Sequence, residues 1–382
     1  MKQKLIKSMT VVIFAGMIFI MSIMNFIKPD KVFSESENRF LAKRPEFSFE
    51  TLFNGKYTSA VEEYITDQFI WRDVFVGMKT QTEYFTGRKD TNGVYFCKDG
   101  YLIEKHDNTK VENELLNRNI DRLHEFIKAT SNKLGDDRVS VMLVPTASNI
   151  LKDKLPAYAT QFDQDRMIDN IKQGMKHGKF IDLPSALAKH SNEYIYYKTD
   201  HHWTTHGAYY AYVAWCDEMG IDIMKKEEFD IKIATNEFYG TIYSKARLSN
   251  TKPDDIYTYM PKQPMTYEVI YNMGSKKTNT LYEKEFLSKR DKYSLFLGGN
   301  NPIVQINSSN KNGKKLLLIK DSFAHCFAPF ISNDFEQVHM LDLRYINMSV
   351  ESYMAQNGIT DVMVLYNTIN FATETNLIKL NK

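Results

Sequence analysis

The pattern of hydrophobic and polar positions separates a membrane-length apolar segment from a long mixed remainder. Ser8 to Ile27 is a run of 20 residues without a charge. A helix rises about 1.5 Å per residue, so this run can cross the roughly 30 Å hydrocarbon core of a bilayer once. Lys2, Lys4 and Lys7 precede it without any acidic residue. This bias predicts a cytoplasmic N-terminal end and an extracytoplasmic remainder.

The same segment can be interpreted as an anchor or as a cleaved signal peptide. A signal peptide has a shorter apolar region that ends at small residues, whereas this run ends in Met24-Asn25-Phe26-Ile27. We therefore interpret residues 1–27 as a cytoplasmic tip and a single-pass transmembrane anchor, with the signal peptide as the alternative. Both interpretations place the remainder outside the cytoplasm.

Linker, helix and hairpin patterns follow the anchor. Residues 28–50 are polar, and we expect a linker without regular structure. Apolar positions then recur at near-helical spacing and predict a helix over 59–80. Two apolar runs, 94–96 and 101–103, flank an Asp-Gly turn and predict a hairpin. A second helix is expected from about residue 111.

Several short, continuous apolar runs predict strands that are buried on both faces, as in a parallel sheet. The intervening lengths suit helical crossovers, so the pattern predicts an open α/β fold. The section from about 221 to 290 is rich in Lys, Asp, Asn and Tyr, and we interpret it as an insertion carrying loops within a domain of residues 51–382. The predicted strands cover 139–144, 315–319, 338–343 and 362–366.

Composition and charge narrow the function classes. The 382 residues are 43% hydrophobic and 25% charged, which excludes a disordered chain and supplies a real core. The formal charge is only +2. The protein therefore has no overall positive electrostatic field that would attract nucleic acid, and we expect no nucleic-acid partner. Cys97, Cys216 and Cys326 are far apart and odd in number. They suggest neither a disulfide framework nor a cysteine zinc site.

The most unusual segment is Lys198 to Gly207, which holds three of the nine histidines. In an extended segment, residues two apart point to the same side, so Asp200 and His202 can face one site. A carboxylate beside an imidazole orients the ring and stabilises its protonated form, as in a hydrolase-type triad. Ordinary structural histidines are the plainer alternative.

A metal site is a further alternative for this segment. His202 and His206 are four residues apart, as two ligands on one helical face are, and Asp200 or His201 could supply a third ligand. However, Trp203 stands where the glutamate of an H-E-x-x-H motif would be. We therefore expect no metal.

A candidate nucleophile lies at Ser322. The predicted strand 315–319 leads into a turn that carries this serine, and a short helix is expected before Pro329. A serine at the carboxyl end of a strand projects into the crevice where open α/β sheets bind ligands, and nearby N–H groups can meet an oxyanion. A plain helix N-cap is the structural alternative. We interpret His325 and Cys326 as lining or packing residues.

Two motifs together carry a family resemblance. The Asp200-His201-His202-Trp203 tetrapeptide and the later Lys320-Asp321-Ser322-Phe323 block resemble the DHHW protein family, which is similar to the alginate O-acetyltransferases AlgJ and AlgX. Further similar stretches include Gly93-Val94-Tyr95 and Asp342-Leu343-Arg344-Tyr345. The resemblance covers nearly all of the exported part. It implies an SGNH-hydrolase-like three-layer α/β sandwich with a mainly parallel sheet. The order of the catalytic motifs is permuted, because Asp and His precede Ser.

The resemblance also implies residue roles. Ser322 would be the nucleophile, His202 the general base and Asp200 its orienting carboxylate. SGNH enzymes have Gly at the position of Lys320. The resemblance therefore defines the oxyanion hole less well than the three catalytic residues. The Ser322 N–H is one expected donor, with Gly299 or Asn300 as a second. The residues expected to line the substrate are His201, Trp203, Arg344 and Tyr345.

The resemblance implies an extracytoplasmic polysaccharide O-acetyltransferase that forms an acetyl-serine intermediate without a cofactor. Because acetyl-CoA is cytoplasmic, it also implies a membrane-bound O-acyltransferase partner that supplies acetyl. The enzyme alternative is a carbohydrate acetylesterase that uses the same three residues. The alternative from another class is a non-catalytic cell-envelope protein whose DHHW loop is structural.

Overall fold

The chain forms two compact units in a computed structural model that describes residues 2–34, 39–106 and 111–381. One unit comprises residues 1–88 with 244–249, and the other comprises 89–243 with 250–382. We call them the N-terminal unit and the sheet unit. Residues 51–88, which the sequence pattern assigned to the α/β domain, have most of their contacts in the N-terminal unit. The predicted division into functional domains remains a prediction.

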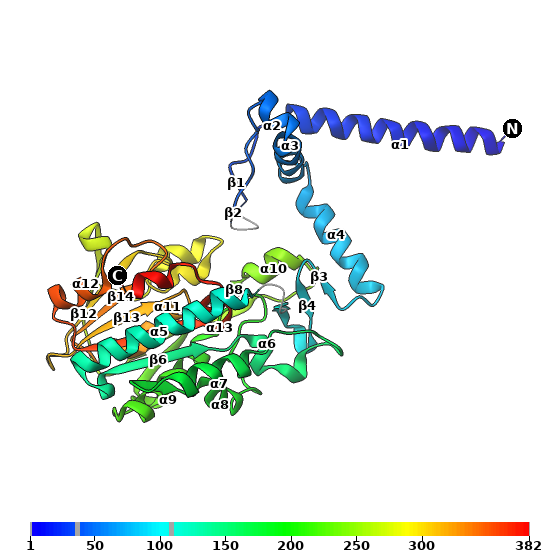
Figure 1. The fold of residues 1–382 in the computed structure, drawn as a ribbon. Coiled ribbons are helices and arrows are strands. Elements are labelled where there is room, and N and C mark those ends of the chain that lie inside the picture. Colours follow the sequence, from blue (N-terminus) through cyan, green and yellow to red (C-terminus); the bar gives the residue numbers. More distant parts are fainter. Residues whose placement is uncertain (1, 35–38, 107–110, 382) are drawn as a thin grey trace. The chain divides into compact units, whose positions relative to one another are not determined.

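The N-terminal unit is built mainly from helices (Figure 1). Its Ile6–Ile27 stretch is long and apolar enough to cross a membrane. The helix expected over 59–80 is two helices, because Trp71 adopts a left-handed conformation with φ 55° between them. The expected linker also contains a short antiparallel pair. The elements are α1 (Lys2–Ile27), β1 (Phe33–Ser34), β2 (Arg39–Phe40), α2 (Phe49–Phe53), α3 (Lys56–Asp67) and α4 (Arg72–Phe85).

An eight-stranded sheet forms the centre of the sheet unit, in the order β11-β10-β12-β14-β13-β15-β6-β7. The five strands from β14 to β7 are parallel, and β12, β10 and β11 continue the sheet in antiparallel pairing. All four predicted strands are present. The bounds are β6 (Val139–Val144), β7 (Lys179–Ile181), β10 (Tyr267–Tyr271), β11 (Lys276–Thr278), β12 (Ile303–Ser308), β13 (Lys315–Lys320), β14 (Gln337–Leu341) and β15 (Asp361–Asn367).

Helices cover both faces of this sheet, which makes three layers. Successive strand residues point to opposite faces, so Leu316 and Leu318 join one core while Leu317 and Ile319 join the other. The first core includes α8 (Leu183–Ala188), α9 (Thr205–Met219) and α11 (Ala324–Ile331). The second includes α5 (Asn113–Leu134), α7 (Gln164–Gly174), α12 (Val350–Asn357) and α13 (Thr368–Thr373). The expected three-layer α/β fold with a mainly parallel sheet is confirmed.

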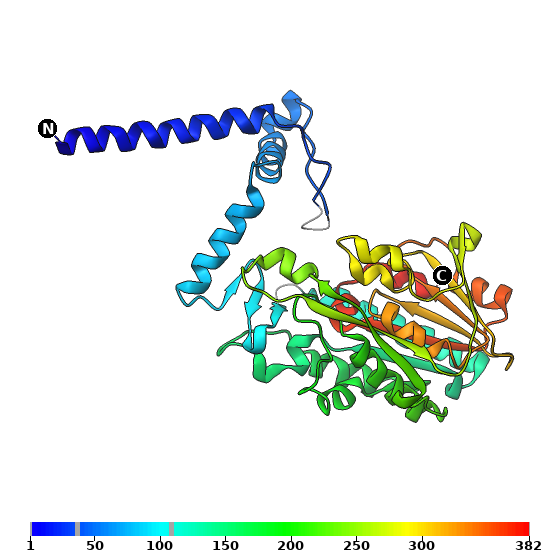
Figure 2. The same cartoon turned by 180° about the vertical axis from the view of Figure 1, so that it is seen from behind.

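The section 221–290 contains more regular structure than the expected loops. It contains the antiparallel pair β8 (Phe229–Phe238) and β9 (Asp254–Pro261), drawn in green in Figure 2, and it supplies β10 and β11 to the main sheet. Its many charged residues concealed an alternating pattern. In β10 every second residue is buried, and Glu268 and Ile270 between them are partly exposed on the opposite face.

Other local predictions are mostly confirmed. The predicted hairpin is β4 (Val94–Phe96) paired with β5 (Leu102–Glu104), and β3 (Asp90–Thr91) adds a third strand. Helix α11 does not end before Pro329 but continues to Ile331. All its residues are buried, so tertiary packing outweighs the hydrogen bond that proline cannot donate. The remaining short helices are α6 (Ala147–Ile150) and α10 (Thr241–Ala246).

Candidate active site

Ser322 lies on the turn between β13 and α11, at the carboxyl edge of the parallel strands. The buried Asp321 carboxylate shapes this turn by accepting the Phe323 N–H at 2.9 Å. It also accepts the Asn367 N–H at 2.8 Å and the Asn370 side-chain amide at 2.7 Å. Burial raises the pKa of Asp321. The carboxyl group therefore fastens the serine turn to the end of β15.

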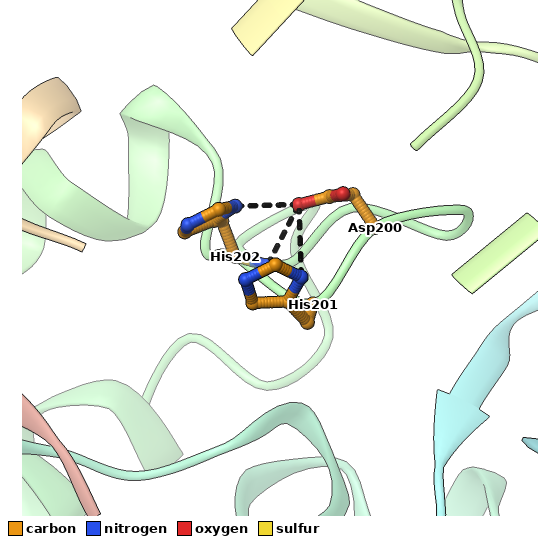
Figure 3. Close-up of side chains that lie close together, drawn as sticks. All are labelled: Asp200, His201 and His202. Carbon is orange, nitrogen blue, oxygen red and sulfur yellow. Dashed lines mark hydrogen bonds and ion pairs between the residues drawn. The ribbon is translucent and has the colours of Figure 1, made fainter. Parts of the chain in front are cut away.

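Asp200 and His202 lie on the loop that enters α9. Thr204 caps this helix, because its hydroxyl accepts the Gly207 N–H at 3.3 Å. The carboxylate of Asp200 lies 2.6 Å from Nδ1 of His202 and also accepts the His202 backbone N–H at 3.1 Å. Figure 3 shows this oxygen linked by dashed lines to both histidine rings. The Asp-x-His spacing thus places both side chains at one site.

The three expected catalytic residues form a continuous chain of hydrogen bonds. Nε2 of His202 lies 2.8 Å from Oγ of Ser322, although 120 residues separate them. Because the Asp200 carboxylate accepts the Nδ1 proton, Nε2 is left to accept the proton of the Ser322 hydroxyl. In serine hydrolases the same order of groups serves as nucleophile, general base and orienting carboxylate.

The environment of Asp200 keeps it ionised. The side chain is 3% exposed, and burial alone would favour the neutral acid. The His201 and His202 rings and the hydrogen bonds outweigh burial and lower the pKa of Asp200. Thr241 contributes through its backbone N–H at 2.8 Å and its hydroxyl at 3.1 Å. A buried negative charge is therefore maintained beside His202.

The section containing β8 and β9 holds the Asp200 loop in place. Asp254 on β9 is buried, and its carboxylate accepts the backbone N–H groups of Lys198 and Thr199, both at 2.8 Å, and the Thr199 hydroxyl at 2.6 Å. Gly240, after β8, lies against Asp200 so closely that a Cβ there would be 2.2 Å from the Asp200 Cβ. Sequence reasoning missed both residues because the section was interpreted as loops.

Tyr293 is a further residue that sequence reasoning missed. Its ring is stacked on the His202 imidazole, with centroids 3.9 Å apart and an interplanar angle of 10°. Its hydroxyl donates to the backbone oxygen of Ser322 at 3.1 Å. It lies on a short 3-10 helix, Lys292–Leu295. No local motif marked this tyrosine among the 23 in the chain.

The four residues expected to line the substrate differ in their accessibility. Trp203 does not line a substrate surface, because it is fully buried and its indole N–H donates to the Phe323 oxygen at 2.9 Å. It supports the nucleophile turn instead. His201 is partly exposed, and Tyr345 is 52% exposed. Arg344 is held by two hydrogen bonds to Asp342, at 2.7 and 2.9 Å.

The oxyanion donors are only partly as expected. The Ser322 N–H has no acceptor within the part of the chain that the structure describes, so it is available to a ligand. Gly299 is not an available donor, because its N–H donates to the Phe296 oxygen at 3.2 Å. Its positive φ of 77° and its close approach to Ser294 make it a turn glycine. The Asn300 side-chain oxygen accepts from Arg344 at 3.4 Å, and its role as a donor remains a prediction.

Lys320, at the position of the SGNH glycine, is buried in a polar network. Its Nζ lies 3.0 Å from the Asp342 carboxylate and 2.9 Å from Nε2 of His325. Burial lowers the pKa of Lys320 and holds that of His325 well below its usual value. Burial also raises the pKa of Cys326 to about 12. A thiol with that pKa stays protonated and is a poor nucleophile.

The ligand atoms of Asp200, His201 and His202 lie within 4.8 Å of one another, close enough for a metal ion (Figure 3). Both ring nitrogens of His202 are already engaged, and Nδ1 of His201 lies 2.7 Å from the Thr241 hydroxyl. An ion here would have to break the bond between Asp200 and His202. His206, the other metal candidate, is instead paired with the Tyr259 hydroxyl.

A small cavity of about 50 Å³ adjoins this cluster at the carboxyl ends of β6 and β15. Its walls are mainly apolar, and His201 and Phe323 form part of them. Asn367 and Asn370 supply polar groups. In open α/β sheets this edge is where ligands bind.

Fold and site together define an α/β protein with a hydrolase-like Ser-His-Asp arrangement. The chain belongs to the DHHW family, whose model, described as "DHHW protein", matches residues 112–341. No curated protein matches the chain.

Solved structures with a similar fold include a DHHW family protein from Eubacterium siraeum. It is 27% identical with a TM-score of 0.64, and the match covers 76% of this chain and 95% of that one. PatB1 from Bacillus cereus, solved with a sulfonyl adduct, is 20% identical with a TM-score of 0.60, covering 75% and 99%. The O-acetyltransferase domain of Pseudomonas putida AlgJ is more distant, at 13% identity and a TM-score of 0.46, covering 75% and 94%.

Proposed function

We propose that this protein is an extracytoplasmic O-acetyltransferase that transfers acetyl groups to hydroxyls of a polysaccharide. The observation that carries the proposal is the pair of contacts made by His202, to Ser322 at 2.8 Å and to Asp200 at 2.6 Å. An imidazole held between a carboxylate and a hydroxyl is the arrangement that activates serine for acyl transfer.

In the first half-reaction, Oγ of Ser322 attacks the carbonyl carbon of an acetyl donor while Nε2 of His202 removes the hydroxyl proton. The Ser322 N–H meets the developing oxyanion. The tetrahedral intermediate collapses to acetyl-Ser322, and His202 returns the proton to the leaving group. Asp200 stabilises the imidazolium throughout.

In the second half-reaction, a sugar hydroxyl attacks acetyl-Ser322 and gives its proton to His202. The C–O bond to Ser322 breaks, the serine oxygen recovers the proton, and the acetylated sugar leaves. If water attacks instead, the products are acetate and free enzyme, so the same residues would serve an esterase.

The resemblance to the alginate acetyltransferases supports a polysaccharide acceptor, and the apolar α1 supports membrane association. We propose that residues 1–27 anchor the protein once, that 28–50 form a tether, and that the domain beyond them is extracytoplasmic. A membrane-bound O-acyltransferase would then bring acetyl across the bilayer. No metal or organic cofactor enters either half-reaction.

Activity and labelling of the detergent-solubilised full chain test the proposal. With p-nitrophenyl acetate and an oligosaccharide, we expect acetylated sugar, and Ser322→Ala should lower the rate by roughly 10⁴-fold. Ser332→Ala, at a buried serine after α11, should leave it unchanged. A sulfonyl fluoride, chosen because PatB1 has been solved with a sulfonyl adduct, should label Ser322 and fail to label it in His202→Ala.

The alternatives predict different results. Acetate without acetylated sugar would identify an esterase. A folded Ser322→Ala variant that leaves polymer acetylation unchanged in cells, together with no sulfonyl labelling, would favour a non-catalytic envelope protein.

A further inference from the structure

The helices of the N-terminal unit carry apolar residues that the protein does not cover. Among the described residues of α2, α3 and α4, no apolar side chain is buried. Helices of 12 and 14 residues, such as α3 and α4, are marginal in water unless an apolar face packs against a partner. The exposed apolar side chains on these helices and between α3 and α4 are Phe49, Phe53, Ile65, Phe69, Trp71, Val74, Phe75, Met78, Tyr84 and Phe85.

The segment between α3 and α4 is hydrogen-bonded to the end of α1. The backbone N–H of Ile70, between α3 and α4, donates to Oδ1 of Asn25 on α1 at 3.0 Å. Met21 and Asn25 on α1, and Lys28 directly after it, are partly buried, and their spacing of three to four residues places them on one side of the chain. The last turns of α1 therefore face α3 within this unit.

A groove of about 580 Å³ lies between these elements. Its α1 wall includes Ile18, Met21 and Phe26, and its α3 wall includes Val61 and Ile65. Residues 18–26 lie within the segment apolar enough to cross a membrane. If that segment spans the bilayer, the groove opens at the depth of one leaflet, where acyl chains replace water.

The rim of the groove carries positive charge and tyrosines. Lys28 and Arg44 line it, and Asp30, the one acidic residue among the described residues of the lining, accepts the Tyr64 hydroxyl at 2.8 Å. Tyr57 also lines the groove. Aromatic residues and Lys or Arg just beyond a span are typical of the headgroup level of a membrane. The apolar walls suit the acyl chains of a phospholipid, and the two cations above them suit its phosphate.

We propose that the groove between α1 and α3 seats a phospholipid of the outer leaflet, with an acyl chain along Met21, Val61 and Ile65 and the phosphate at Lys28 and Arg44. The N-terminal unit then rests on the membrane surface. The inference depends on the proposed anchoring by α1. It is independent of the chemistry at Ser322.

Tryptophan fluorescence tests the membrane seating, because Trp71 is 54% exposed whereas Trp203 and Trp215 are buried. The full chain is reconstituted into vesicles of phosphatidylglycerol with brominated acyl chains, and flotation is scored in parallel. We expect quenching of Trp71 emission, with the remaining emission of Trp71→Phe unquenched. A protein that floats with unquenched Trp71 overturns the proposal while leaving the anchor intact. A protein that does not float overturns both.

Native mass spectrometry tests whether the groove between α1 and α3 binds a phospholipid. We expect the full chain, released from vesicles in mild detergent, to retain a phospholipid, and Arg44→Gln and Lys28→Gln each to weaken retention about fivefold. Lys262→Gln, at an exposed lysine of the sheet unit, is the matched control. Ile65→Glu should abolish retention, whereas Ile233→Glu, at an exposed position on β8, should not. Equal retention in all variants overturns the lipid assignment.

Discussion

The phenol ring of Tyr293 lies flat on the imidazole of His202 while its hydroxyl donates to the backbone oxygen of Ser322. One buried side chain thus touches both the proposed base and the turn that carries the proposed nucleophile. The face of an aromatic ring attracts a cation. The stack therefore fixes the plane of the imidazole beside Ser322, and the ring face is available to a positive charge during proton transfer.

Two substitutions at Tyr293 separate these contributions. Tyr293→Phe keeps the stack and loses the hydroxyl contacts with the Ser322 backbone oxygen and Cys326 Sγ, and we expect kcat with p-nitrophenyl acetate to fall about tenfold. Tyr293→Leu loses both the stack and the hydroxyl. We expect its kcat to fall further than that of Tyr293→Phe and the sulfonyl labelling of Ser322 to be slower. Circular dichroism checks that both variants fold. Equal rates for Phe and Leu would show that the stack contributes nothing to catalysis.

Gly240 offers a test of how precisely Asp200 must be placed. In Gly240→Ala, the new methyl group would lie 2.2 Å from Cβ and 2.4 Å from Oδ2 of Asp200, so the Asp200 side chain must leave its position beside His202. A displacement of this kind should lower kcat by about 10²-fold and also lower stability, which urea unfolding measures separately. Gly77→Ala, on α4, meets nothing closer than 3.6 Å and should have the activity of the parent. A Gly240→Ala enzyme with the parent rate would contradict the orienting role of Asp200.

Much of the site could be predicted because its signals are local. Asp200 and His202 are two residues apart, and an extended segment places such residues on one side. Ser322 follows a continuous apolar run, which marks the end of a buried strand. The pairing of two such signals 120 residues apart rested on the family resemblance, and the contact between His202 and Ser322 agrees with it.

The residues that hold the site could not be predicted, because their partners are distant in the chain. Asp254 binds backbone groups at Lys198 and Thr199, more than 50 positions away, and nothing near Asp254 in the sequence indicates that pairing. Trp203 was expected at the substrate, although indole is as often a core group. Composition misled the interpretation of 221–290, since charged residues on the outward face of strands resemble loop residues.

The same long-range packing creates a pH-dependent stability. His325 and His339 are 2% and 1% exposed, and burial holds the pKa of His325 well below its usual value and lowers that of His339 to about 4. The unfolded chain takes up protons at these positions near pH 6.5 and the folded chain does not, so stability must fall as pH drops below that value. By pH 5 each histidine costs about 2 kcal/mol.

Urea unfolding at pH 7.5 and pH 5 measures this loss. His339→Gln should remove the contribution of one histidine and so lose less stability over that interval than the parent. Its stability at pH 7.5 falls if Gln cannot keep the bond to the Tyr353 hydroxyl, but the difference between the two pH values is unaffected by that loss. An unchanged difference would mean that His339 titrates normally in the folded protein.

Chelation distinguishes the serine mechanism from the metal alternative. Both ring nitrogens of His202 are engaged by Asp200 and Ser322, so the proposed reaction uses no ion and EDTA should leave kcat unchanged. Added zinc should inhibit, because an ion held by Asp200, His201 and His202 would take the carboxylate from the imidazole. His201→Ala should be less sensitive to zinc, measured against its own metal-free rate. If EDTA abolishes activity and zinc restores it, the cluster is a metal centre and Ser322 is not activated as proposed.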